Sequence, residues 1–188
     1  PYDESEELLA NTDHPLARMQ YKRIQSQHTD RNALFIPFKK ELAAFSQAEH
    51  DALKPFILEQ NIPTLQKHIE EGVLTYESLT LFYLYRIYHF EFQRETFLNA
   101  IISLNPDVLK QARLLDKEPK PELSHLVYGM PILLKDNIDA VPMATTAGAA
   151  AMAQNFPVAD AFIVSQLKSR GALILGKVNL SEWAYYFC

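Results

Sequence analysis

Two short apolar runs in the last third of the chain restrict its fold more than any other feature. The first, Pro-Ile-Leu-Leu, occupies residues 131–134, and the second, Ala-Leu-Ile-Leu, occupies residues 172–175 and ends at Gly176. Runs of this length and composition predict strands buried on both faces. Between them, apolar residues recur at helical spacing behind Asp160, which can cap that helix. Strand, helix and strand in this order are typical of a parallel sheet with a crossover, so we expect an α/β fold.

The first two thirds of the chain are patterned as helices. Thr64 can cap a short helix that Gly72 ends, and Thr75 can cap a second one. This second helix is apolar nearly all round, which predicts that it is buried. A third helix is expected to start at Asn-Pro-Asp, residues 105–107, and to run to about Asp116.

These patterns predict two parts. Residues 1–57, which are polar and begin with an acidic cluster, are expected to form a helical N-terminal extension. Residues 58–188 are expected to form the N-terminal part of an α/β/α sandwich with a mostly parallel or mixed sheet.

The composition excludes several classes of protein. A net charge of −5 gives little reason to bind nucleic acid or an anionic membrane. The single cysteine, Cys188, excludes an internal disulfide and a thiolate metal cluster, and five glycines are too few for a phosphate loop or a nucleophile elbow. The longest nearly uncharged run, residues 140–158, is too weakly apolar to span a membrane. The compartment stays open, since the chain begins with Pro1 rather than Met.

Lys135 is the residue that stands out as a candidate for catalysis. The six histidines have no metal-binding spacing, so we predict neither a metal nor a cofactor. Lys135 follows the first apolar run directly, at the end of a strand where open α/β sheets place their ligand crevices. Desolvation there would favour the neutral amine, which can act as a base. The alternative is that the stem passes the sheet edge and the ammonium lies in water.

A longer stretch around Lys135 resembles a known family. Residues 128–139 read Tyr-Gly-Met-Pro-Ile-Leu-Leu-Lys-Asp-Asn-Ile-Asp, which is similar to the G-[IM]-P-x-x-[LV]-K-D-N segment of the amidase signature family. Residues 142–148 follow as its T-x-A-G turn, and residues 171–184 resemble its G-A-x-x-x-G-K-x-N-x-x-E-[WF]-A block. The resemblance covers about residues 61–188, and residues 137–145 look most like the peptide amidases.

The resemblance implies amide hydrolysis by a Ser–cis-Ser–Lys triad. Lys135 would take a proton from a bridging serine, which activates the nucleophilic serine, and a glycine-rich turn would stabilise the oxyanion. In the family both serines follow the second block, so we expect them in polypeptide beyond Cys188 and expect these 188 residues to be inactive alone. Asp136 and Asn137 are expected to order the turn that presents Lys135.

Three further residues of the family blocks are less informative. Asn179 and Glu182 have the spacing of a capping box, so a helix start explains them as well as a role in the site does. Ala149 stands where the family often has serine, which would either remove a hydrogen bond in the site or be harmless.

Three functions remain open from the sequence. The first is an amide hydrolase acting on a small-molecule or peptide amide. The second is the A-type subunit of an amidotransferase, which releases ammonia for a partner subunit, and the third is a non-catalytic binding domain or fragment. We expect no nucleic acid among its partners and no membrane-spanning segment in the chain.

Overall fold

The computed structural model describes residues 5–16, 20, 31–91, 93, 95–121 and 125–181. The strands in these ranges are β1 (Ile101–Leu104), β2 (Pro131–Lys135) and β3 (Leu173–Val178). Two short 3-10 helices, η2 and η3, cover Ile36–Phe38 and Ala150–Met152. The α-helices are α1 (Ser5–Asn11), α3 (Arg31–Phe35), α4 (Lys39–Ala44), α5 (Gln47–Ile57), α6 (Ile62–Glu70), α7 (Tyr76–Glu91), α8 (Val108–Lys117) and α9 (Phe162–Ser169).

The three strands form a mixed sheet in the order β1-β3-β2. β2 and β3 are parallel and are joined through α9, which confirms the crossover predicted from the two apolar runs. β1 pairs with β3 in the antiparallel direction and was not expected from the sequence. β3 also continues through Gly176 to Val178 instead of ending at the glycine, because residues 176–178 still pair with both neighbours.

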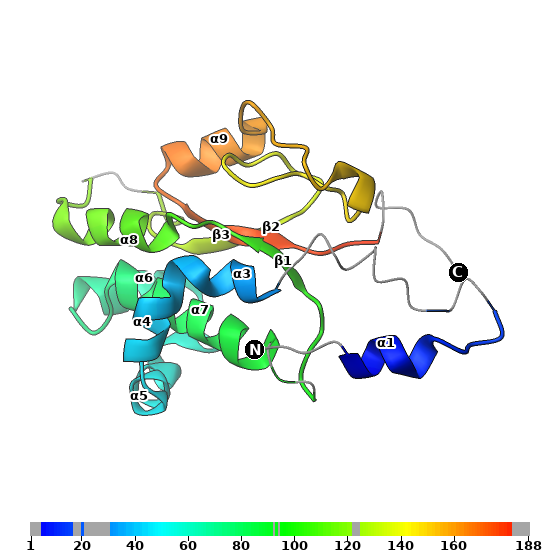
Figure 1. Ribbon diagram of the computed structural model, residues 1–188. Helices are drawn as coiled ribbons and strands as arrows, with labels where there is room; N and C mark the ends of the chain where they lie inside the picture. The colour runs from blue at the N-terminus through cyan, green and yellow to red at the C-terminus, as the bar shows by residue number, and fades with distance from the viewer. Residues whose placement is uncertain are drawn as a thin grey trace.

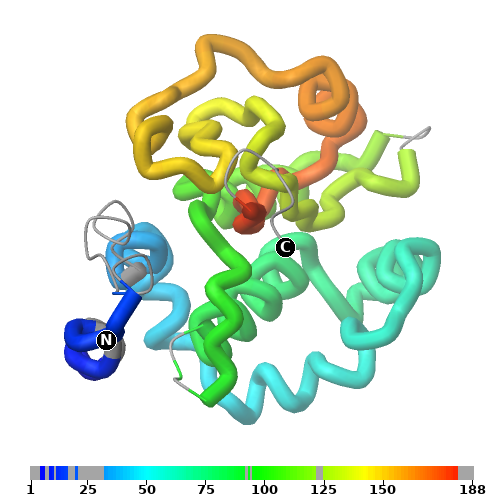
Figure 2. Tube along the Cα trace, turned by 90° about the vertical axis from the view of Figure 1, so that its right-hand side faces the viewer, coloured from blue at the N-terminus to red at the C-terminus, as the bar shows by residue number. Residues whose placement is uncertain are grey.

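Helices cover the sheet on both sides. Most of the helices lie below the sheet in Figure 1, and α9 lies above it. Figure 2 shows the same division, with β3 in red between the cyan and green helices and the yellow and orange segment that carries α9. The predicted α/β class with a mixed sheet is therefore confirmed, and the segment between β2 and α9 lies in the α9 layer.

Two apolar clusters hold these layers together. The larger lies between the helices and the sheet, and α7 contributes Leu79, Phe82 and Leu84 to it. The smaller joins β2 and β3 to α9 through Leu134, Ile174 and Val164, among others. The predicted burial of α7 holds for its first turns, whereas its last turn is partly exposed at Tyr88 and Phe90.

The helices before residue 57 share the larger cluster. Phe35, Phe38, Leu42 and Ile57 are buried in it together with residues of α7 and of β1. Phe35 also packs edge-on against Tyr88 of α7. The division at residue 57 stays a prediction, and the described residues on its two sides have one core in common.

Three helices start at other residues than the sequence indicated. Asn61 rather than Thr64 caps α6, and its side chain accepts a hydrogen bond of 2.9 Å from the Thr64 N–H. α8 begins at Val108, because the Asn105 side chain accepts from the Asp107 N–H and makes a turn there. α9 begins at Phe162 without a side-chain cap, since Asp160 binds other groups.

Some predictions fall outside the described residues. Glu182, the partner of Asn179 in the expected capping box, is one of them, and Cys188 is another. In the part of the chain that the structure describes, no helix is both long enough and apolar enough to cross a membrane. Those same residues contain no group of three or more His, Cys, Asp or Glu side chains placed to hold a metal ion.

Candidate active site

Lys135 ends β2 and starts the loop that leads to α9. Its carbonyl accepts the Ile138 N–H at 3.0 Å, which closes a turn over residues 135–138. The Lys135 side chain is exposed, as in the alternative in which its stem passes the sheet edge and its end lies in water. The reason is the alternation along β2: Ile132 and Leu134 pack towards α9, whereas Leu133, which is 38% exposed, and Lys135 belong to neither cluster.

Asp136, the next residue, is fully buried. Its backbone N–H donates to the Val178 carbonyl, and its backbone carbonyl accepts the Ala147 N–H at 3.1 Å. Its Oδ2 atom accepts from both the backbone N–H and the hydroxyl of Thr146. The T-x-A-G turn is thereby bound to the residue that follows Lys135. Asn137, in contrast, lies exposed on the turn.

A second lysine, Lys177 of β3, contacts the other carboxylate oxygen of Asp136. Its Nζ atom lies 3.2 Å from Asp136 Oδ1, and both side chains are fully buried. The same Nζ donates to the Ala144 carbonyl at 2.9 Å and to the Thr145 hydroxyl at 2.8 Å. Burial lowers the pKa of Lys177, and the neighbouring carboxylate of Asp136 acts in the opposite direction.

Lys177 owes its direction to a bulge in the sheet. Ile132 of β2 pairs with Ile174, but the next residue, Leu133, pairs with Gly176, so Leu175 is an extra residue on β3. Simple alternation would have turned Lys177 towards the helical cluster, as it does Leu175. Because the extra residue changes the phase, Lys177 pairs with Leu134 and faces the α9 layer instead.

Lys177 is a residue of this region that the sequence patterns did not single out. The strand was expected to end at Gly176, and the bulge that turns Lys177 inwards has no clear signature in single-residue patterns. A signal was nevertheless present, since a lysine directly behind a buried apolar strand is rarely buried itself without a partner. Asp136, at the end of the neighbouring parallel strand, is that partner.

Another ion pair holds the far side of the same loop. Asp160 accepts from the Val141 N–H at 2.8 Å and from Lys168 Nζ through both oxygens, each at 2.8 Å. Lys168 also donates to the Val141 carbonyl. The peptide bond between Val141 and Pro142 is cis. The loop after Lys135 is thus attached to β3 at one end and to α9 at the other.

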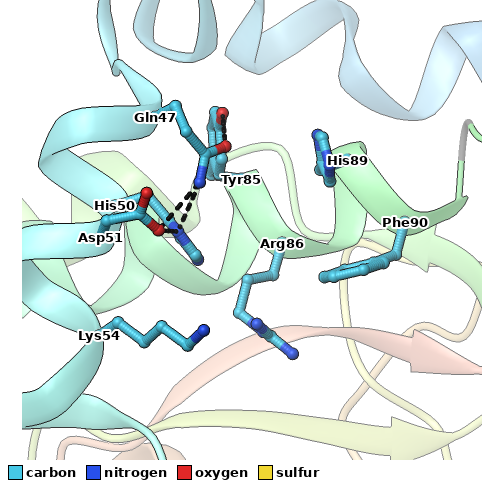
Figure 3. Close-up of a pocket in the computed structure, with 8 residues that line it drawn as sticks. All are labelled: Gln47, His50, Asp51, Lys54, Tyr85, Arg86, His89 and Phe90. Atoms are coloured by element: carbon cyan, nitrogen blue, oxygen red, sulfur yellow. Dashed lines mark hydrogen bonds and ion pairs between the residues drawn. The ribbon is translucent and has the colours of Figure 1, made fainter.

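A separate pocket of about 140 Å³ lies between α5 and α7, in the helical layer (Figure 3). His50 lines it and stacks on Phe82 with a centroid distance of 4.6 Å, while its Nδ1 lies 3.1 Å from Asp51 Oδ1. The other ring nitrogen, Nε2, is buried and has no hydrogen-bond partner among the described residues. His50 is thus a buried residue that packs α5 against α7.

Comparison with known proteins places this geometry in a family. The sequence profile described as Amidase matches residues 79–187. The probable amidase At4g34880 of Arabidopsis thaliana is 36% identical over 134 residues, which are 69% of this chain and 25% of that protein. The A-type subunit of a glutamyl-tRNA(Gln) amidotransferase from Exiguobacterium sibiricum is 39% identical over 87 residues, 46% of this chain and 18% of its own length.

Solved structures agree with the fold. An amidase family protein from Bacillus anthracis str. Ames superimposes with a TM-score of 0.77 at 34% identity, covering 85% of this chain and 32% of that one. The native peptide amidase from Stenotrophomonas maltophilia gives a TM-score of 0.62 at 42% identity, covering 67% of this chain and 26% of the other. The chain spans a quarter or less of the curated relatives given above. With the family profile matched over more than half of its residues, this chain belongs to the amidase family.

Proposed function

We propose that this chain supplies the lysine base of an amide-cleaving active site, and that the base is Lys135. The observation that carries the proposal is the family match across the β2 end, together with the place of Lys135 at the start of an anchored loop. An exposed amine at the carboxyl end of a parallel strand lies where such sheets bind their ligands.

The mechanism follows from what the resemblance implies. The neutral amine of Lys135 takes a proton from a bridging serine, which takes one from the nucleophilic serine as that oxygen attacks the amide carbon. The tetrahedral intermediate expels ammonia or an amine, and water then cleaves the acyl-enzyme. Both serines would come from polypeptide outside these 188 residues. Asp136 would position Lys135, since its carboxylate and carbonyl fix the turn next to it.

We infer a peptide amide or another small carboxamide as the substrate. The similarity to the S. maltophilia peptide amidase supports this class. The similarity to A-type amidotransferase subunits supports the second candidate, release of ammonia from an amide for a partner subunit. Hydrolysis of a peptide amide without any partner favours the first candidate, and dependence on a co-purified B-type subunit favours the second.

The test is Lys135→Ala in the complete polypeptide that carries these residues. We expect kcat/KM for a peptide amide to fall by about 10²–10⁴-fold, the usual contribution of a general base. The matched control is Lys110→Ala, an exposed lysine on α8. Near-parental hydrolysis by the Lys135 variant would refute the assignment. The 188 residues alone are expected to show no turnover, and unaided hydrolysis by them would contradict the proposed origin of the serines.

A further inference from the structure

The buried pair formed by Lys177 and Asp136 does more than join two strands. We propose that Lys177 is a positioning residue for Lys135: its ammonium fixes the Asp136 carboxylate, neutralises it, and ties it to the 144–146 loop. The inference rests on the proposed function, because it assigns Lys177 a part in keeping Lys135 usable as a base.

The contacts of Lys177 favour its charged form and exclude it as the base itself. An ammonium has three N–H donors, and Nζ has three acceptors around it: the Ala144 carbonyl, the Thr145 hydroxyl and the Asp136 carboxylate. A base needs a free lone pair directed at the substrate, and the side chain of Lys177 has no exposure to solvent. Lys177 therefore acts on other groups of the protein.

Lys177 affects both the position and the protonation of Lys135 through Asp136. The two strands end side by side, with Lys135 paired to Val178 and Leu134 paired to Lys177. Asp136 is covalently next to Lys135 and is held by Thr146 on one oxygen, so Lys177 completes its surroundings on the other. Without Lys177, a buried negative charge would remain beside Lys135 and would favour the protonated amine.

The other charged groups nearby do not replace this pair. Asp139, on the same loop, also acts on Lys177 through its charge. On the α9 side, Lys168 and Asp160 are 2.8 Å apart and neutralise each other. Removing one partner of the Lys177–Asp136 pair therefore leaves a net charge next to Lys135, whose sign depends on which partner is removed.

The experiment uses this dependence on sign. Lys177→Met leaves Asp136 charged, so the pH midpoint at which Lys135 loses its proton should rise by about one unit or more. Asp136→Asn leaves Lys177 charged, so the midpoint should fall by a similar amount. The double variant removes both charges and should return the midpoint most of the way to the parent. General damage to the fold does not produce shifts of opposite sign.

The midpoint is measured without relying on amide hydrolysis. Trace acetylation of Lys135 by acetic anhydride across a pH series, quantified by peptide mass spectrometry, reports the fraction of neutral amine in the complete polypeptide. In parallel, kcat/KM for a peptide amide at neutral pH should fall about tenfold in Lys177→Met, the rate equivalent of a one-unit shift, while KM changes little. Lys120→Met, which breaks an ion pair with Glu70 in the helical layer, is the control.

Two outcomes overturn the inference: midpoints that do not move, or midpoints that move in the same direction in both single variants. If Lys177→Met does not fold, Asp136→Asn and the double variant still give the comparison. If the parent hydrolyses no amide, the proposed function fails while the acetylation midpoints still decide the role of Lys177.

Discussion

Tyr76 shows how a single buried group makes stability depend on pH. It is the first residue of α7, and its ring packs edge-on against Tyr128 while filling the space next to Gly129. Its hydroxyl is buried without a hydrogen-bond partner among the described residues. Burial, with smaller effects from Tyr128, Asp116 and Glu70, raises the pKa of Tyr76 to about 12. The neutral phenol is therefore strongly preferred in the folded protein.

This preference predicts how the free energy of unfolding changes with pH. A phenol with a pKa of 10.0 when unfolded and about 12 when folded contributes stability that is complete below pH 10 and is lost as pH rises towards 12. Tyr76→Phe should raise the free energy of unfolding at pH 7 by about 1 kcal/mol, because it removes an unpaired buried hydroxyl. In urea unfolding followed by circular dichroism, the advantage of the variant should widen above pH 10.

Tyr85→Phe is the control for that experiment, since the Tyr85 hydroxyl donates to Gln47 Oε1 at 3.0 Å. Its loss should lower the free energy of unfolding by up to about 1 kcal/mol. A Tyr76→Phe variant that is equally destabilised at pH 7 would mean that the Tyr76 hydroxyl has a partner in solution.

At the scale of elements, the pairing of β1 with β3 depends on a glycine. A Cβ atom added at Gly176 would lie 2.4 Å from the Ser103 carbonyl oxygen, which belongs to the backbone of β1 and cannot easily move. Gly176→Ala should therefore cost about 1–3 kcal/mol in the free energy of unfolding, the usual range for overpacking. Hydrogen exchange at the Asn105 amide, which donates to the Leu175 carbonyl, should become faster.

Gly72→Ala is the control that separates steric overlap from backbone strain, the two ways in which replacing a glycine can lower the free energy of unfolding. Gly72 has a φ of +73° and no atom within 4 Å of its added Cβ, so its replacement costs backbone strain alone, about 1–2 kcal/mol. It should leave exchange at Asn105 unchanged. Equal effects of both variants on that amide would contradict a specific role of Gly176 in strand pairing.

The elements differ in how far they could be predicted. β2, α9 and β3 were predictable because their apolar runs and helical spacing are local signals. β1 was not, since Ile-Ile-Ser-Leu is four residues long and owes its conformation to pairing with residues 176–178. The position of Lys135 came from the same local pattern, whereas Lys177 faces the loop only because of the bulge at Leu175. Register is a property of two strands together and is not contained in either run.

At the scale of the whole molecule, Arg113 of α8 joins three helices of one layer. Its Nε atom donates to Glu77 of α7 at 2.8 Å, and its Nη2 atom donates to Glu41 of α4 at 3.1 Å. Burial opposes the ionisation of Glu41, but hydrogen bonds from its own backbone and from Arg113, with the charge of Arg113, hold its pKa below 4.5. α4 precedes residue 57 and α7 follows it, so Arg113 links the two parts expected from the sequence.

Glu41→Gln should therefore make the free energy of unfolding depend less on pH below about pH 4.5. A carboxyl whose pKa is lowered on folding contributes stability that is present above pH 4.5 and is lost as pH falls through the folded value. Because the pair is partly exposed, the loss in the variant above pH 4.5 should be at most about 1 kcal/mol. Denaturation midpoints at pH 7 and at about pH 3 measure it, and an unchanged difference between the two would count against this link.

The strand order also determines when the strands can pair while the chain is being synthesised. Among the described strands, β1 and β2 pair only with β3, and β3 is the last of the three to be made. β1 ends at Leu104 and β3 begins at Leu173, so at 5–20 residues per second a ribosome needs roughly 3–14 s to supply the partner of β1. During that interval β1 can pack against α3, which has already been synthesised. Packing against α3 thus covers part of β1 during the stage of biosynthesis when its unpaired edge could otherwise pair with another chain.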